Sequence, residues 1–102
     1  TMSSLIFLDV SSNKLTGSVP SELGNLRELR QMLLSGNDLK GKIPDSICMM
    51  RENNLNQLMV DCLDTESGSA KVVCPCCTLC CNKDSCCEWN KRRRIFEFCF
   101  AP

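Results

Sequence analysis

Residues 5–23 read LIFLDVSSNKLTGSVPSEL, and residues 29–47 repeat the same pattern as LRQMLLSGNDLKGKIPDSI. Apolar residues recur at matching positions, with an Asn, a Gly and a Pro at fixed places between them, and every matched position is offset by 24 residues. A third unit begins at Leu55, displaced by 26 residues, and its pattern ends after Val60. Such self-similarity is typical of a repeat architecture, in which stacked units bury a shared core.

The start of each unit alternates apolar and polar residues, which predicts a short strand. We expect three parallel strands, over Leu5–Ser11, Leu29–Ser35 and Leu55–Asp61. In the first repeat the inward positions would be Leu5, Leu8, Val10, Leu15, Val19, Leu23 and Leu26. Leu8, Met32 and Leu58 would then stack in one interior column.

Two asparagines, Asn13 and Asn37, stand where the chain leaves a strand and turns. A side-chain amide at such a bend hydrogen-bonds backbone groups that the bend leaves unpaired, so we expect both to be structural and to face the interior. Gly17 and Gly41 would permit the tight passage beneath them. Pro20 and Pro44 would end the short second strand of each unit, where no amide donor is needed.

The two units resemble the plant-type leucine-rich repeat, LxxLxLxxNxLxGxIPxxLGxLxx, and the third unit matches its beginning. This resemblance implies an α/β solenoid, a fragment of a right-handed horseshoe with one short strand per repeat on a concave parallel sheet. We assign residues 1–61 to two full repeats and a partial third. Because Thr1-Met2-Ser3-Ser4 leads almost at once into the strand pattern, we expect the chain to be a piece of a longer protein.

The resemblance also implies that the outward strand positions form the ligand-binding surface on the concave face. These positions are Phe7, Asp9, Ser11, Gln31, Leu33, Ser35, Gln57, Met59 and Asp61. Apolar residues in a row on an exposed face can mark a binding surface, whereas the alternative is a solvated face that binds nothing.

Ten cysteines in 102 residues favour a disulfide scaffold, and nine of them follow residue 61. The exposed end of a repeat array needs a cover, so we expect residues 62–102 to form a disulfide-rich C-terminal cap. The disulfide candidates are Cys62, Cys74, Cys76, Cys77, Cys80, Cys81, Cys86, Cys87 and Cys99. This block resembles the cap that follows plant-type repeats in microalgal, particularly diatom, leucine-rich-repeat proteins.

We expect Cys62 to pair with a cysteine of the 74–81 block, for example Cys74, and the turn signals Ser67-Gly68-Ser69 would let the chain fold back. The competing interpretation is zinc, because Cys74-x-x-Cys77 and Cys77-x-x-Cys80 have the spacing of paired thiolate ligands. The absence of histidine and the overlap at Cys77 favour disulfides. We therefore expect no metal and no cofactor.

Three features near the end of the chain complete the cap. We expect Trp89 to pack within it, and the run Lys91-Arg92-Arg93-Arg94 to be a solvated loop rather than a nucleic-acid contact or a processing site. Residues 95–100 alternate like a strand, which would place Phe96, Phe98 and Phe100 on one face.

Composition restricts the function. Twelve basic and twelve acidic residues cancel, so no overall field attracts nucleic acid, and without histidine no Ser-His-Asp or Cys-His site can form. The longest aliphatic-aromatic run has four residues against the roughly 18 of a membrane span, so we expect no transmembrane segment in the chain. We expect a secreted or cell-surface recognition module that binds a protein or peptide and is not an enzyme. The alternatives are a metal-binding cysteine domain on a short repeat and a truncated product without independent function.

Overall fold

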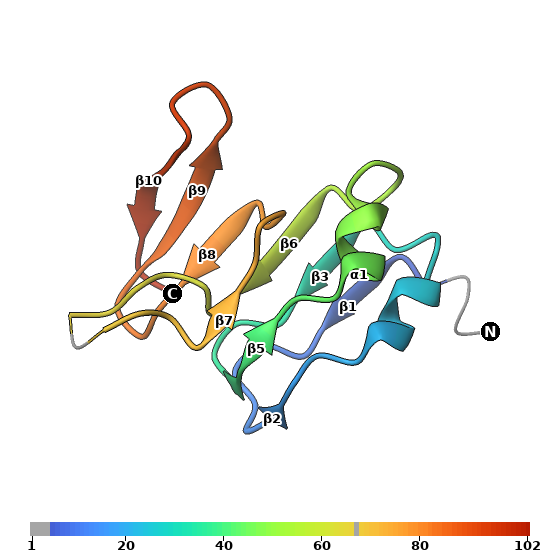
Figure 1. Ribbon diagram of the computed structural model, residues 1–102, viewed down its shortest axis with the longest axis horizontal. Coiled ribbons are helices and arrows are strands. Elements are labelled where there is room, and N and C mark those ends of the chain that lie inside the picture. Colours follow the sequence, from blue (N-terminus) through green and yellow to red (C-terminus); the bar gives the residue numbers. More distant parts are fainter. Residues whose placement is uncertain (1–4, 67) are drawn as a thin grey trace.

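The computed structural model describes residues 5–66 and 68–102, and Figure 1 shows the chain. Thr1-Met2-Ser3-Ser4 and Ser67 lie outside the described residues, so the predictions that concern them are not tested. Next to Ser67, the amide of Thr65 donates to the Gly68 carbonyl at 2.9 Å and that of Gly68 donates back at 3.2 Å. Thr65 and Gly68 thus form an isolated antiparallel bridge.

A six-stranded sheet runs through the molecule in the order β1-β3-β6-β8-β9-β10. Its first strands are β1 (Phe7–Asp9), β3 (Gln31–Leu33) and β6 (Gln57–Val60), which are parallel as predicted. Leu8 lies opposite Met32 and Met32 opposite Leu58, which confirms the interior column.

The strands are shorter than predicted, although inter-strand hydrogen bonding continues past their ends. The amide of Arg30 donates to the Ile6 carbonyl, and that of Ser12 donates to the Ser35 carbonyl at 2.9 Å. The chain bends at these points into the turns that link the sheet to the return side.

The return side of each repeat carries short elements. They are β2 (Thr16–Gly17), a 3-10 helix η2 (Ser21–Asn25), β4 (Asp38–Leu39), β5 (Gly41–Lys42), the helix α1 (Asp45–Met50) and β7 (Val72–Val73). β2 pairs with β4 and β5 pairs with β7, both in parallel. Backbone hydrogen bonds therefore also join consecutive units on the return side. Gly17 and Gly41 have φ of 82° and 92°, a region that other residues rarely adopt, which confirms their predicted role.

The core lies between the sheet and the return side. Its fully buried side chains include Leu29, Met32, Ile43, Ile47, Leu55, Leu58 and Val60. All of these belong to the second and third units, where each side chain has a neighbour on both sides.

The first repeat is more exposed than predicted. Val19 and Leu26 are buried, whereas Leu5, Leu8, Val10 and Leu23 are half-buried and Leu15 is 43% exposed. Within residues 5–66 and 68–102 no further turn stacks against this side of β1, since β1 is the edge of the sheet. The repeat pattern correctly gives the inward positions, but burial also needs a neighbouring turn.

The cap extends the sheet rather than sitting apart from it. β8 (Leu79–Cys81) adds in parallel to β6, and β9 (Cys86–Asn90) and β10 (Ile95–Phe100) follow as an antiparallel hairpin that projects beyond the repeats (Figure 1). The sheet is continuous across residues 61 and 62, so the division into 1–61 and 62–102 stays a prediction.

All ten cysteines form disulfides, as the composition predicted. The pairs are Cys48–Cys76, Cys62–Cys80, Cys74–Cys77, Cys81–Cys86 and Cys87–Cys99. Cys62 does pair within the 74–81 block, but the example of Cys74 was wrong, because the strand register places Cys80 beside it and Cys74 closes a short loop with Cys77. Cys48 on α1 was missing from the candidates, and its bond to Cys76 ties the second repeat to the cap.

The end of the chain departs from simple alternation. The pairing of β9 with β10 shifts between Glu97 and Phe100, and Phe98 has a positive φ of 54°, so a β-bulge interrupts the strand. Phe96, Phe98 and Phe100 therefore do not share one face, and that prediction was wrong. Phe96 packs against the core and meets Trp89 at 4.9 Å between ring centroids. Trp89 contacts Phe96 as a packing role requires, but it remains 37% exposed rather than enclosed within the cap.

Candidate functional site

The outward face of the sheet collects the positions predicted to bind a ligand. Along each strand the even-numbered residues Leu8, Met32 and Leu58 point into the core, so the odd-numbered residues point away from it. Phe7, Gln31 and Gln57 form one row across three strands. Asp9, Leu33 and Met59 form the next row, which Leu79 of the cap continues. The structure thus brings these residues together as adjacent neighbours.

An apolar strip runs across this face. Leu33 and Met59 are directly paired and half-buried, and Phe7, two residues before the partner of Leu33, is 48% exposed. A diagonal neighbour of this kind is within reach of an aromatic side chain. The hydroxyl of Ser35 donates to the Met59 sulfur at 3.2 Å and holds that side chain in place.

Asp9 gives one end of the strip a fixed negative charge. Its carboxylate accepts hydrogen bonds from the Ser11 hydroxyl and, at 2.9 Å, from the Ser11 amide. These bonds favour the ionised form and lower the pKa of Asp9 below its ordinary value, the hydroxyl being the larger cause. Asp9 is therefore charged, oriented and exposed.

Asp61 lies on the same face but has a structural task that the sequence analysis did not identify. Its two oxygens accept hydrogen bonds from the amides of Gly36 and Asn37, at 2.9 and 3.0 Å. The carboxylate of the third unit thus closes the turn of the second. The sequence gives one signal for this role: Asp61 follows directly after the third predicted strand, next to the turn of the second unit, where Gly36 and Asn37 need acceptors for their backbone amides.

Asn37 is structural, as predicted, because its side-chain nitrogen donates to the carbonyls of Val10 and Leu34 at 3.0 and 2.9 Å and its oxygen accepts from the Leu15 amide at 3.1 Å. It is half-buried and joins the first repeat to the second. Asn13 also donates to backbone carbonyls, of Val10 and Ser11, but it is exposed, so its predicted interior placement was wrong. Asn13 is exposed for the same reason as Leu15: β1 is the edge strand of the sheet, and no described turn stacks on its outer side.

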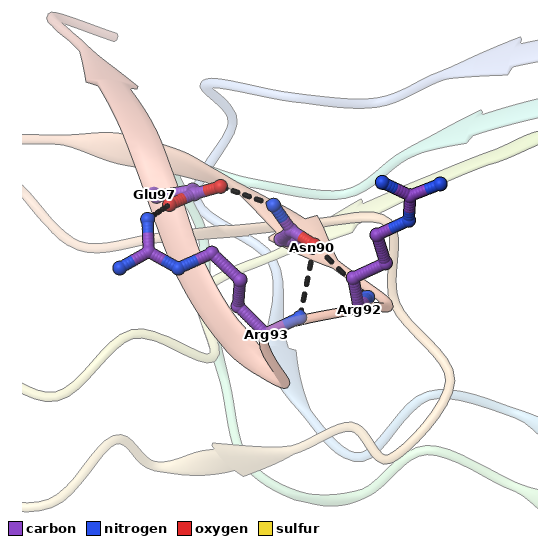
Figure 2. A network of polar contacts seen from close by, with 4 residues as sticks. All are labelled: Asn90, Arg92, Arg93 and Glu97. Atoms are coloured by element: carbon purple, nitrogen blue, oxygen red, sulfur yellow. Dashed lines mark hydrogen bonds and ion pairs between the residues drawn. The ribbon is translucent and has the colours of Figure 1, made fainter.

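The basic run forms the turn of the β9–β10 hairpin, in agreement with the predicted loop. Figure 2 shows how the turn is held: the Asn90 side chain accepts from the amides of Arg92 and Arg93 and donates to the Glu97 carboxylate, which also pairs with the Arg93 guanidinium at 2.9 Å. The Arg92 guanidinium points away from this network (Figure 2). Arg93 compensates for the placement of Glu97 opposite Glu88, a like-charge pair across the two strands.

Within residues 5–66 and 68–102 no polar or charged side chain is fully buried. Neither helix in the described part of the chain has the length and hydropathy that a membrane span requires.

Comparison with known proteins identifies the repeats. Residues 4–26 and 28–50 match the Leucine Rich Repeat family. The family match ends at residue 50, before the cap, so the similarity of the cap to those of diatom proteins stays a prediction. No solved structure matches the chain.

The curated relatives are plant receptor-like proteins. The chain is 50% identical over 44 residues to the leucine-rich repeat receptor-like serine/threonine-protein kinase RGI4 of Arabidopsis thaliana, which covers 43% of this chain and 4% of that protein. It is 46% identical over 46 residues to receptor-like protein 52 and 49% identical over 49 residues to receptor-like protein 49 of the same plant. These matches cover 45% and 48% of this chain and 6% of each relative. The chain therefore spans only a small part of the length of the proteins it matches.

Proposed function

We propose that this chain is, through residues 4–50, a plant-type leucine-rich-repeat protein of the receptor-like class, and that its outward sheet face binds an extended segment of a partner protein or peptide. Leucine-rich repeats are protein-interaction modules of a solenoid-type fold. The finer proposal is that these turns belong to a right-handed horseshoe, with residues 1–61 as repeats and 62–102 as their cap. The face of the sheet would then be the concave side.

The observation that carries this proposal is the apolar strip beside a charged carboxylate. Phe7, Leu33 and Met59 offer apolar surface on three adjacent strands, and Asp9 is ionised at its end. None of the nine outward positions is basic. A complementary partner segment would carry an apolar side chain for the strip and a Lys or Arg for Asp9.

Extracellular placement supports the same proposal. Five disulfides need an oxidising compartment to form and persist, and receptor-like relatives point to an ectodomain. We propose that the chain works outside the cell or at its surface, as a recognition part that performs no chemistry. The kinase named among the relatives is matched over only 4% of its length, so no catalytic activity transfers from it.

The test is a selection of displayed random peptides on the immobilised, oxidised chain. We expect the selected peptides to combine an apolar residue with Lys or Arg, and Leu33→Lys to weaken their binding at least about tenfold, which corresponds to about 1.4 kcal/mol. Met49→Lys is the matched control, because Met49 is 64% exposed on α1 at the return side of the repeat.

Two results would contradict the proposal. One is peptides that bind the Leu33→Lys chain as well as the original while that chain remains folded. The other is peptides whose binding is lost with Met49→Lys, which would move the site to the return side.

A further inference from the structure

Two of the five disulfides meet at the junction between the last repeat and the cap. The sulfurs of Cys62, Cys77 and Cys80 lie within 4.8 Å of one another. Cys62 is bonded to Cys80, and Cys77 is bonded to Cys74, which lies three residues earlier in the same loop. We call these three sulfurs, together with that of Cys74, the junction cluster.

Strand register explains why these sulfurs meet. Val60 lies opposite Cys80 in the parallel pair of β6 and β8, and both side chains are buried on the core side of the sheet. Cys62 follows two residues after Val60, at a position that returns to the same side. Cys77 precedes β8 by two residues and is 4% exposed. The cluster is a product of the fold, so it is formed whenever β8 is docked on β6.

The dimensions of the cluster suit a soft metal ion. Zinc takes four thiolates in a tetrahedron at about 2.3 Å, which puts the sulfurs about 3.8 Å apart. The sulfurs of Cys62, Cys77 and Cys80 already lie within 4.8 Å of one another, close to that spacing. Once both bonds are opened, the Cys74 sulfur would turn from Cys77 toward the ion. The Cys74-x-x-Cys77 and Cys77-x-x-Cys80 spacings, which overlap at Cys77, become compatible because Cys62 supplies the fourth ligand from another strand.

The surroundings also favour an anionic centre. The Arg51 guanidinium donates at 3.0 Å to the carbonyl of Cys76, the residue next to Cys77, and at 2.6 Å to the carbonyl of Leu55. It places a positive charge beside the loop that carries Cys77. A zinc ion with four thiolates has a net charge of −2, which such a neighbour partly compensates.

We propose that in the reduced chain Cys62, Cys74, Cys77 and Cys80 bind one Zn²⁺ ion, which takes the place of the two disulfides of the junction cluster. Each disulfide gains two electrons and two protons from a dithiol, which leaves as its own disulfide, so two dithiols are consumed. Zinc then displaces the four thiol protons and binds four thiolates. In this state the metal, rather than the Cys62–Cys80 bond, ties β6 to the cap.

This inference does not depend on the peptide-binding proposal, because it concerns only the packing of β6, β8 and the intervening loop. It gives a reduced chain, before its disulfides form, a way to hold the cap in its final place. Thiol–disulfide exchange with two molecules of a small disulfide would later take two electrons for each bond, join the same sulfurs, reduce each small disulfide to its thiols and release zinc.

The experiment maps the ligands in the full chain. The chain is reduced with excess dithiol, freed of it without oxygen, mixed with one equivalent of zinc and treated with an alkylating reagent, and the labelled cysteines are identified by mass spectrometry. We expect Cys62, Cys74, Cys77 and Cys80 to be labelled at least about tenfold more slowly than without zinc, since a metal-bound thiolate is a poor nucleophile. The six other cysteines should be labelled at unchanged rates.

Two double variants provide the control. Cys62→Ser with Cys80→Ser should lower the zinc affinity at least about 100-fold, because two of four ligands are lost. Cys87→Ser with Cys99→Ser removes a disulfide outside the cluster and should leave the affinity unchanged. Protection of Cys81, Cys86, Cys87 and Cys99 instead, protection spread evenly over all ten thiols, or no protection at all would overturn the proposal.

Discussion

The first and second repeats carry the same motif at an offset of 24 residues, yet they are buried to different degrees. Leu39 is 7% exposed whereas its counterpart Leu15 is 43% exposed, and Met32 is fully buried whereas Leu8 is half-buried. The second repeat has β1 on one side and β6 on the other, whereas β1 is an edge strand. The motif therefore specifies which side chains point inward, and the neighbouring turns decide what those side chains contribute.

The largest expected difference concerns the interior column. Leu58→Ala should lower the free energy of unfolding by about 2–5 kcal/mol, because Leu58 is fully buried and its removal leaves a cavity. Leu8→Ala should cost less than half as much, since Leu8 is only half-buried. Urea unfolding of both variants under oxidising conditions measures the two costs. Equal losses would mean that the two ends of the array are equally packed.

The Cys62–Cys80 bond should contribute nearly as much. It closes a loop with a sequence separation of 18, for which chain entropy gives about 3 kcal/mol. Cys62→Ser with Cys80→Ser should therefore lower the free energy of unfolding by about that amount and speed amide exchange in β6. Cys87→Ser with Cys99→Ser is the control, because it loosens the hairpin and should leave β6 unchanged. If exchange in β6 responds equally to both, the cap does not act through the junction.

The two asparagines test the comparison at a polar position. Asn37→Ala should cost about 1–3 kcal/mol, because the Leu15 amide and the Leu34 carbonyl lose this partner in a half-buried turn. The Val10 carbonyl loses one of its two donors and keeps the Asn13 side chain. Asn13→Ala should cost less than about 0.5 kcal/mol, since water replaces its bonds at an exposed site. Thermal unfolding of the two variants distinguishes them. If the Asn13→Ala variant were less stable than the Asn37→Ala variant, the larger structural role would belong to Asn13 and this prediction would be wrong.

The smallest effect concerns the pH dependence of Asp9. Its pKa is lowered in the folded chain by the Ser11 hydroxyl and amide, so the bonds stabilise the fold fully above about pH 3.9 and are lost as the pH falls through the lowered value. Ser11→Ala removes the larger cause and should raise the pKa of Asp9 towards its ordinary value. An NMR titration of the Asp9 carboxyl carbon measures this shift. Ser18→Ala, on the return side, should leave the titration unchanged.

The sequence predicted the repeat units because their positions are fixed by local geometry. The strands, the interior column, the glycines with positive φ and the role of Asn37 all follow from one offset and from alternation within a unit. Disulfide bonding as such followed from composition, and pairing of Cys62 with the 74–81 block followed from chain continuity.

The contacts that the sequence did not predict lie between distant segments. Cys48 bonds to Cys76 because α1 packs where the cap returns, and Asp61 reaches the Gly36 and Asn37 amides from the next strand along the sheet. No regular spacing in the sequence indicates that Cys48 bonds to Cys76 or that Asp61 accepts from the Gly36 and Asn37 amides. The bulge that separates Phe96 from Phe100 was missed because alternation over residues 95–100 gives no sign of the extra residue.

The most direct test of the difference between the repeats compares two amides at equivalent positions. The Val10 amide donates to the Leu33 carbonyl at 3.0 Å, and the Leu34 amide, 24 residues later, donates to the Met59 carbonyl at 2.8 Å. The two bonds are alike, but Val10 is half-buried at the edge and Leu34 is buried between two strands. We expect hydrogen exchange at Val10 to be at least about tenfold faster than at Leu34, after correction for intrinsic rates. Equal protection of the two amides, or slower exchange at Val10, would contradict the account.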